Sequence, residues 1–345
     1  MNDAASERNP TRLFAIVFLV VLLSTAFVLA FKMFFVLFAG VLFALLLRTA
    51  AAFVCRVIRL PYGVALTVLV LAGIAGSTVG AWLLVPSVEQ QLEELGRDLP
   101  KMMTDLRNRF ESTPIVGQVL SANTGNHFDP KSAGRAALGA LGGSVAVLSG
   151  LVITFFIGVY GAAQPESYVK AALSVAPRRY ERYVERALHE IAHNLTRWLW
   201  GRILAMAFVG TTTSIVFHLL HLPLALTLGL LAGLLTFIEY AGAILSAVPP
   251  VLLGFSQSST TGLAVFIAYV VLHVIEGYVL TPLLARASVH LPPALTLAAQ
   301  ALLGEIVGVL GLTFSTPLFV VAVSAAKAFR EEREHTSTRD DTSSP

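Results

Sequence analysis

The chain has 345 residues, of which 56% are hydrophobic and 13% are charged. Soluble domains carry about 25% charged residues, so this composition excludes an ordinary soluble protein; with several apolar runs of about twenty residues, it predicts an all-α integral membrane protein. The net charge of +3 comes without a basic cluster interleaved with aromatic residues, which argues against a nucleic-acid partner. A single cysteine excludes an internal disulfide.

Residues 1–85 contain three predicted transmembrane helices. The three apolar runs are Leu13–Phe31, Met33–Leu47 and Tyr62–Val85. Because only Lys32 separates the first two runs, we expect them to form a tight hairpin. Arg48, Arg56 and Arg59 follow the second run and mark a cytoplasmic loop by the positive-inside rule, which also predicts a cytoplasmic N-terminus.

Residues 86–137 form a polar insert that we expect outside the cytoplasm. Its apolar residues recur every three or four positions, which predicts an amphipathic helix. They are Val88, Leu92, Leu95, Leu99, Met102, Leu106 and Phe110. Such a helix lies on the membrane surface or packs against neighbouring subunits, and the pattern favours neither. Residues 138–163 form the fourth predicted span, which returns to the cytoplasm.

A second amphipathic helix is predicted over residues 164–198. The arginines in this range outnumber its acidic residues, which indicates the cytoplasmic side. Residues 199–328 form a C-terminal transmembrane region, and residues 329–345 are predicted to be a charged, disordered cytoplasmic tail. If each apolar segment crosses once, the chain has about eight transmembrane helices, and both termini lie in the cytoplasm.

The C-terminal region contains a repeated segment. Leu222–Leu228 returns as Leu291–Leu297, with six of seven residues identical at an offset of 69. Each copy continues as an apolar run of about thirty residues, or about 45 Å of helix, whereas the hydrocarbon core is about 30 Å thick. We therefore expect each copy to tilt, overhang or break, and paired interrupted segments indicate the binding site of a transporter. The residues expected at helix breaks or close helix contacts are Gly242, Pro249, Pro250, Pro282, Gly304, Gly308, Gly311 and Pro317.

Three acidic residues, Glu239, Glu276 and Glu305, lie inside the predicted membrane region. A charge in hydrocarbon costs at least about 2.5–3.5 kcal/mol, so such a residue normally faces a cavity or a partner. Carriers coupled to protons or cations use buried carboxylates of this kind, because protonation removes the charge. The alternative is a structural ion pair with Arg202 or Arg286. The other candidates for the transport pathway or for coupling are Gln300, Tyr240 and Arg286.

His189-Glu190-Ile191-Ala192-His193 matches the H-E-x-x-H motif of zinc proteases, in which both histidines lie on one face of a helix. The extended motif needs a glycine and a further histidine, where this chain has Thr196 and Leu199. No acidic residue lies between Thr196 and Ile238 to supply a third ligand. We therefore expect no metal site, no cofactor and no enzymatic activity, and we interpret the motif as part of an exposed, charged helix.

Several segments of the last 150 or so residues resemble a known family. They are Ala225–Gly233, Phe237–Leu245, Ile275–Pro282 and Gly304–Gly311, with the later Pro317. These runs, and the order of three spans, a polar insert and the remaining spans, resemble the autoinducer-2 exporter family of bacterial membrane proteins. The resemblance implies a multi-span, oligomeric transporter without catalytic residues; some members export the quorum-sensing signal autoinducer-2, and others are assigned sodium/proton antiport. The chain departs from the family at Glu239, where proline is usual, and at Arg202, where glutamine is frequent.

We expect the protein to export a small polar solute, such as autoinducer-2, across a bacterial cytoplasmic membrane. The mechanism is expected to be secondary transport, since no nucleotide-binding motif is present. The expected partners are the lipid bilayer, the solute or a monovalent cation with protons, and further copies of the chain. A sodium (or other cation)/proton antiporter is the first alternative. The second is a non-transporting scaffold that binds partners through its two amphipathic regions.

Overall fold

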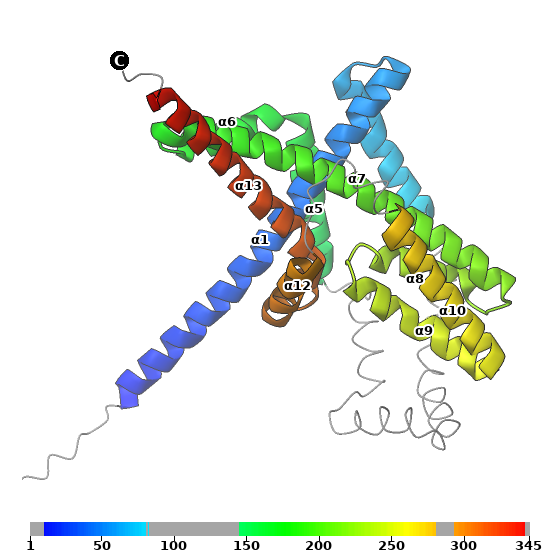
Figure 1. The fold of residues 1–345 in the computed structure, drawn as a ribbon. Coiled ribbons are helices and arrows are strands. Elements are labelled where there is room, and N and C mark those ends of the chain that lie inside the picture. Colours follow the sequence, from blue (N-terminus) through cyan, green and yellow to red (C-terminus); the bar gives the residue numbers. More distant parts are fainter. Residues whose placement is uncertain (1–9, 81, 83–144, 281–292, 342–345) are drawn as a thin grey trace, which may run out of the picture.

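The structure is a computed structural model that describes residues 10–80, 82, 145–280 and 293–341 (Figure 1). Every regular element in these ranges is a helix. In chain order they are α1 (Pro10–Ile58), the helix Tyr62–Gly80, α5 (Val145–Ala163), α6 (Pro165–Val175), the 3-10 turn η2 (Arg178–Tyr180), α7 (Glu181–Leu219), α8 (Ala225–Leu235), α9 (Ala241–Gln257), α10 (Ser259–Ile275), the π-helix η3 (Glu276–Leu280), α12 (Pro293–Val307) and α13 (Val309–Asp341). The predicted insert 86–137, Pro282 and Arg286 lie outside the described residues.

The predicted hairpin at Lys32 is wrong, because α1 runs without interruption from Pro10 to Ile58. No glycine or proline occurs between Thr11 and Ala39, and lysine itself is a good helix former, so nothing in this stretch favours a turn. The helix is about 74 Å long at about 1.5 Å per residue. Two predicted spans are therefore one helix, and the cytoplasmic position of the N-terminus no longer follows from them.

Five described helices are long and apolar enough to cross a membrane, or six if α5 and α6 are counted as one broken span. The five are Met33–Ile58 within α1, Tyr62–Gly80, α7, Ser259–Leu280 and Val309–Arg330 within α13. The predicted fold class of an all-helical, multi-pass membrane protein is confirmed for the described residues. The predicted count of eight spans is not, because other apolar stretches form shorter helices of 11, 17 and 15 residues.

Two helices are longer than the predicted segments. The predicted amphipathic helix 164–198 is divided: its first part forms α6 and η2, and its second part continues with the following span as α7, one helix of 39 residues. α13 continues to Asp341, so the described part of the tail that we expected to be disordered is helical. Neither α7 nor the stretch of α13 that follows Pro317 contains a proline. The charged stretches of α7 and α13 therefore remain helical, because Glu, Lys and Arg are good helix formers and a high content of charge does not end a helix.

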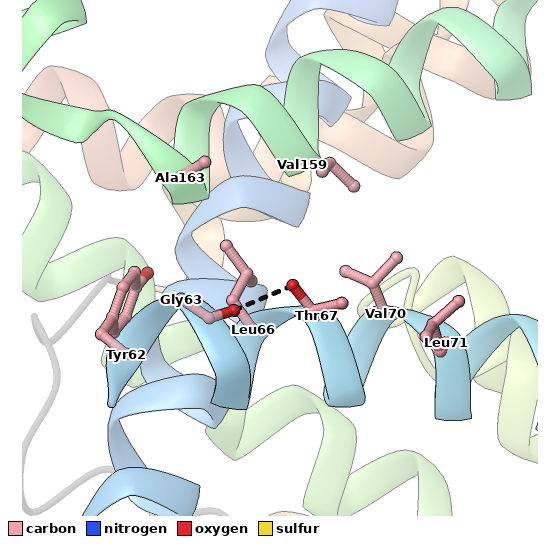
Figure 2. A pocket seen from close by; sticks show the side chains of 8 residues that line it. All are labelled: Tyr62, Gly63, Leu66, Thr67, Val70, Leu71, Val159 and Ala163. Carbon is pink, nitrogen blue, oxygen red and sulfur yellow. Dashed lines mark hydrogen bonds between the residues drawn. The ribbon is translucent and has the colours of Figure 1, made fainter. Parts of the chain in front are cut away.

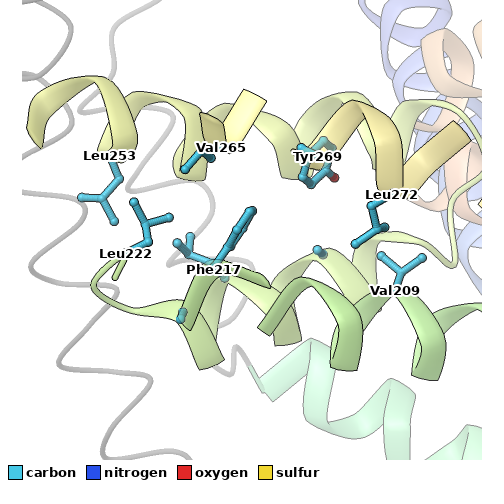
Figure 3. Close-up of a cluster of buried hydrophobic side chains, with 10 residues drawn as sticks. Val209, Phe217, Leu222, Leu253, Val265, Tyr269 and Leu272 are labelled. Atoms are coloured by element: carbon cyan, nitrogen blue, oxygen red, sulfur yellow. The ribbon is translucent and has the colours of Figure 1, made fainter. Parts of the chain in front are cut away.

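Three apolar clusters hold the helices together. The first, drawn in Figure 3, joins α7, α8, α9 and α10 through Val209, Phe217, Leu222, Ala225, Leu228, Ala232, Leu253, Val265, Tyr269 and Leu272. The second joins α1, α7 and α13 through Leu42, Leu195, Trp198, Leu199 and Val320. The third joins α1, α5 and the helix Tyr62–Gly80 through Leu47, Ala51, Leu66 and Ala162. α7 belongs to the first two clusters, and Figure 1 shows α8, α10 and α13 beside it.

Glycines allow α7 and α8 to approach closely. A Cβ atom on Gly229 would lie 2.7 Å from the carbonyl oxygen of Gly210, and one on Gly233 would lie 2.9 Å from the Cα of Gly210. Gly229 and Gly233 are four residues apart and share one face of α8. This is the small-residue packing that membrane helices use, because lipid supplies no hydrophobic force between them.

Both copies of the repeated segment are broken into two helices. α8 and α9 are separated at Thr236–Tyr240, where Tyr240 has a φ of 53°, and α12 and α13 are separated at Gly308, which has a φ of 68°. The breaks do not lie at the prolines, since Pro249 and Pro250 are inside α9 and Pro317 is inside α13. Membrane helices tolerate proline where neighbouring groups satisfy the backbone.

Residues at the offset of 69 occupy similar places in the two copies. A Cβ atom on Gly242 or on Gly311 would overlap a carbonyl oxygen of the preceding short helix, α8 or α12. Ser246 and Ser315 are each only 1% exposed. In both copies, then, a glycine closes the angle between two helices and a buried serine follows one turn later.

We expect Gly308→Ala to lower the free energy of unfolding by about 1–2 kcal/mol, because a residue with a Cβ is strained in the left-handed region. Apart from its chain neighbours, no atom of the described residues lies within 4 Å of the position that the new Cβ would take, so the variant measures backbone strain and not a steric clash. Gly308→Asn should be destabilised less, since asparagine adopts this conformation more readily. Thermal unfolding in detergent checks both variants; equal stability of Gly308→Ala and the native protein would contradict the expectation.

Candidate functional site

The break between α8 and α9 positions Glu239. α8 ends at Leu235, and the hydroxyl of the next residue, Thr236, donates a hydrogen bond of 2.7 Å to the carbonyl oxygen of Ala232. Tyr240, whose φ is positive, then starts α9 in a new direction. Glu239 therefore lies in an irregular turn between two helices, where side chains and backbone groups can both reach neighbouring elements.

Glu239 contacts three other helices. The guanidinium of Arg202 on α7 lies 3.7 Å from its carboxylate, and the hydroxyl of Thr316 on α13 donates to the same carboxylate over 3.3 Å. The amide of Gln300 on α12 donates to the backbone carbonyl of Glu239 over 2.7 Å. Arg202 also donates to the carbonyl oxygen of Phe237 over 3.2 Å. The site thus joins both broken elements to α7.

These side chains are largely sheltered. Gln300 and Thr316 are each 3% exposed, and the side chains of Arg202 and Glu239 are 11% and 25% exposed. The 3.7 Å between Arg202 and Glu239 is longer than the 2.7–2.9 Å or so of a charge-assisted hydrogen bond. The two charges balance each other, and both groups keep hydrogen-bonding capacity that a polar molecule could use.

The second candidate acid, Glu276, pairs with a histidine. Its carboxylate lies 2.9 Å from Nδ1 of His273, one turn earlier at the end of α10. The π-helix η3 begins at Glu276, and single π-turns are frequent at functional sites. The buried Nε2 of His273 has no hydrogen-bond partner among the described residues.

A polar contact between α9 and α10 lies next to this pair. The ring of Tyr269 is 4.5 Å from the ring of His273, and its hydroxyl is 2.5 Å from the hydroxyl of Ser246. Arg202 is acted on by the charges of both Glu239 and Glu276. Arg202 therefore interacts electrostatically with both candidate acids.

The remaining predicted residues are not gathered at this site. Glu305 is exposed on α12 and has no polar partner within the described ranges, and Tyr240 is 43% exposed. Sequence reasoning did not single out Thr316 or Tyr269. Thr316 could have been identified from the sequence, because it forms a polar pair with Ser315 within an otherwise apolar segment.

The H-E-x-x-H motif lies on the arginine-rich half of α7. Nε2 of His193 lies 3.3 Å from the guanidinium of Arg197, one turn further along, and neither His189 nor His193 is buried. Across the described residues, no group of three or more His, Cys, Asp or Glu side chains is placed to hold a metal ion.

An apolar groove of about 390 Å³ lies between the helix Tyr62–Gly80 and α5 (Figure 2). Its lining residues are Tyr62, Gly63, Leu66, Thr67, Val70, Leu71, Val159 and Ala163. None of these side chains is charged, and the hydroxyl of Tyr62 already donates a hydrogen bond of 2.7 Å to the carbonyl oxygen of Ala162. The groove suits a lipid chain better than a polar solute.

Comparisons with known proteins find a transporter family and several similar transport proteins. A family model described as "AI-2E family transporter" matches residues 14–331. Three proteins of Bacillus subtilis (strain 168), whose names describe them as candidate transport proteins, are similar to the chain. YueF is 25% identical over 72% of this chain and 68% of its own length; YrrI is 26% identical over 52% and 51%; YdbI is 23% identical over 84% and 83%.

Proposed function

The chain belongs to the AI-2E transporter family, and from this premise we propose that it exports a small polar solute, such as autoinducer-2, by a secondary mechanism. The observation that carries the proposal is the site around Arg202 and Glu239. A sheltered arginine and carboxylate lie 3.7 Å apart, beside the buried polar groups of Gln300 and Thr316. These groups supply both donors and acceptors, which is what a polyhydroxylated or carbonyl-containing solute requires.

The positions of the other acids refine the proposed pathway. Glu276 lies within the electrostatic reach of Arg202, whereas Glu305 lies exposed on α12. We therefore propose Glu239 and Glu276 as the groups that contact the solute or the coupling ion, with Gln300 as a positioning residue. Glu305 becomes a matched control, because it is also a membrane-region glutamate but has no polar partner among the described residues.

We propose a bacterial cytoplasmic membrane as the location, with copies of the chain assembled together. The hydroxyl of Tyr183 near the start of α7 donates to the carbonyl of Ala325 on α13 over 3.2 Å, so the arginine-rich end of α7 and the charged end of α13 lie on one side. The positive-inside rule assigns that side, and with it the C-terminus, to the cytoplasm.

A flux assay in proteoliposomes tests the proposed function. Autoinducer-2 is loaded on one side, and its movement is followed together with the signal of a pH-sensitive dye after addition of sodium or potassium. Solute flux above that of empty liposomes supports the proposal. Cation-dependent proton flux without solute movement supports antiport instead. Absence of both, with folded and inserted protein, contradicts both functions.

Cation/proton antiport is the second candidate, because two acids in the apolar part of the chain, Glu239 beside Arg202 and Glu276 beside His273, are groups that a proton or a monovalent cation can bind. If it is correct, Glu276→Gln should abolish cation-dependent proton flux, since His273 loses its carboxylate partner. Glu305→Gln should leave the flux within about twofold of the native value. Equal losses in both variants would contradict a specific role for Glu276.

A further inference from the structure

α6 runs almost perpendicular to the apolar helix before it. The axes of Leu148–Ala163 and Pro165–Val175 differ by 94° across the single residue Gln164. α6 has 11 residues and is about 16 Å long, which is too short to cross a hydrocarbon core of about 30 Å. If α5 crosses the bilayer, α6 lies along the membrane surface at the end of that crossing.

The two faces of α6 differ in polarity. Tyr168, Ala172 and Val175 follow the spacing of one helical face, while Lys170 and Ser174 lie on the other. None of the residues of α6 is buried; Tyr168 is 52% exposed and Val175 is 85% exposed. An exposed apolar face on a helix that lies along the surface is typical of interfacial helices, which insert that face among the acyl chains.

A basic segment follows α6 directly. Residues 178–186 contain four arginines and two glutamates, a net charge of +2. Arg178 lies in η2 and Arg182 in the first turn of α7, and both side chains are exposed. Arginines beside an interfacial helix are complementary to anionic lipid headgroups. The guanidinium matches a phosphate with two parallel hydrogen bonds.

We propose that α6 and the following basic segment form a membrane-surface anchor. The apolar face of α6 lies in the acyl region, and Arg178 and Arg182 bind the phosphates of anionic phospholipids such as phosphatidylglycerol. The anchor fixes α5 and the start of α7 relative to the bilayer surface. It is independent of which solute the protein carries.

Spin labels at two positions of α6 test its depth. Cys55 is first replaced by serine, and Ala172→Cys or Ser174→Cys then carries a nitroxide in the full chain, reconstituted in bilayers that contain phosphatidylglycerol. Residues two apart point to nearly opposite sides of a helix. We expect the label at 172 to collide mainly with oxygen and the label at 174 mainly with a water-soluble nickel complex. A label at 172 that is shielded from both, as a second protein copy would make it, or that meets mainly nickel, would overturn the proposal.

Lipid binding tests the arginines. We expect Arg178→Gln with Arg182→Gln to weaken phosphatidylglycerol binding by about tenfold relative to the native protein, measured by native mass spectrometry with uncharged phosphatidylcholine as reference. Arg178→Lys with Arg182→Lys should restore most of the preference for the anionic lipid, because the charge is kept. An unchanged preference in the glutamine variant would show that other groups bind the lipid.

Discussion

Glu239→Gln is expected to lower solute flux by about tenfold or more. The variant lacks the charge-assisted hydrogen bond that we propose between Glu239 and the solute, and one such bond contributes about 1.5–3 kcal/mol. The same change leaves the sheltered guanidinium of Arg202 without its nearest carboxylate. Removing one member of a buried pair destabilises a protein by about 3–5 kcal/mol, and the 25% exposure of Glu239 places this site near the lower end of that range. Flux and thermal unfolding are both measured on the same reconstituted protein.

A double variant separates the transport role from a purely structural one. Glu239→Gln combined with Arg202→Gln removes both charges, so most of the lost stability should return. Flux should stay low, because the groups that contact the solute are still missing. If flux returns together with stability, the pair only holds helices together and the proposed site is wrong. Glu305→Gln, with flux and stability near the native values, serves as the control.

Gly229→Leu should disrupt the contact between α7 and α8. Any Cβ at this position meets backbone atoms, with the carbonyl oxygen of Gly210 and the amide nitrogen of Ser214 both at 2.7 Å. Backbone atoms cannot rotate away as a side chain can, so the destabilisation should exceed about 3 kcal/mol, the upper end of the range that is typical of overpacked cores. A loss of about 10 °C in the melting temperature is expected.

A matched substitution isolates the effect of this contact. Gly76 lies on the helix Tyr62–Gly80. Apart from this helix itself, no atom of the described residues lies within 4 Å of the position that a Cβ would take there, so Gly76→Leu should change the melting temperature little. Gly229→Ala should fall between Gly229→Leu and the native protein. Combining Gly229→Ala with Ser214→Gly should not restore stability, because the clash with backbone atoms remains. Full recovery in that double variant would contradict this account of the contact.

The sequence was sufficient for the membrane class, because this depends on local hydrophobicity. The length of each apolar copy exceeds the bilayer thickness, but length alone left open whether the copy tilts, overhangs or breaks. The sequence was not sufficient for the start of the chain. Lys32 was interpreted as a turn because it is charged, although a turn also needs residues that favour leaving the helix. The prolines were expected at helix breaks or close helix contacts, but Pro249 and Pro317 lie inside helices. The breaks lie instead at Thr236–Tyr240 and at Gly308.

The site itself was only partly predictable. Glu239 and Gln300 are predictable as candidate site residues, because a polar side chain in an apolar membrane segment normally faces a cavity or a polar partner. Arg202 is predictable as a partner for the acids. Their contact depends on tertiary structure, since the amide of Gln300 reaches a carbonyl 61 residues earlier in the chain. The same reasoning could not distinguish Glu239 from Glu305, because both have the same local pattern and differ only in which helices pack beside them.

The position of Arg202 and Glu239 in the chain has a consequence for biosynthesis. Arg202 binds the turn at Phe237, 35 residues later, whereas Gln300 follows Glu239 by a further 61 residues. At about 5–20 residues per second, a ribosome needs about 3–12 s to add that later segment. During this interval the nascent chain already holds a cation and an anion that neutralise each other. The first broken element can therefore enter the bilayer before the second has been made, and the second completes a site whose charges are already matched.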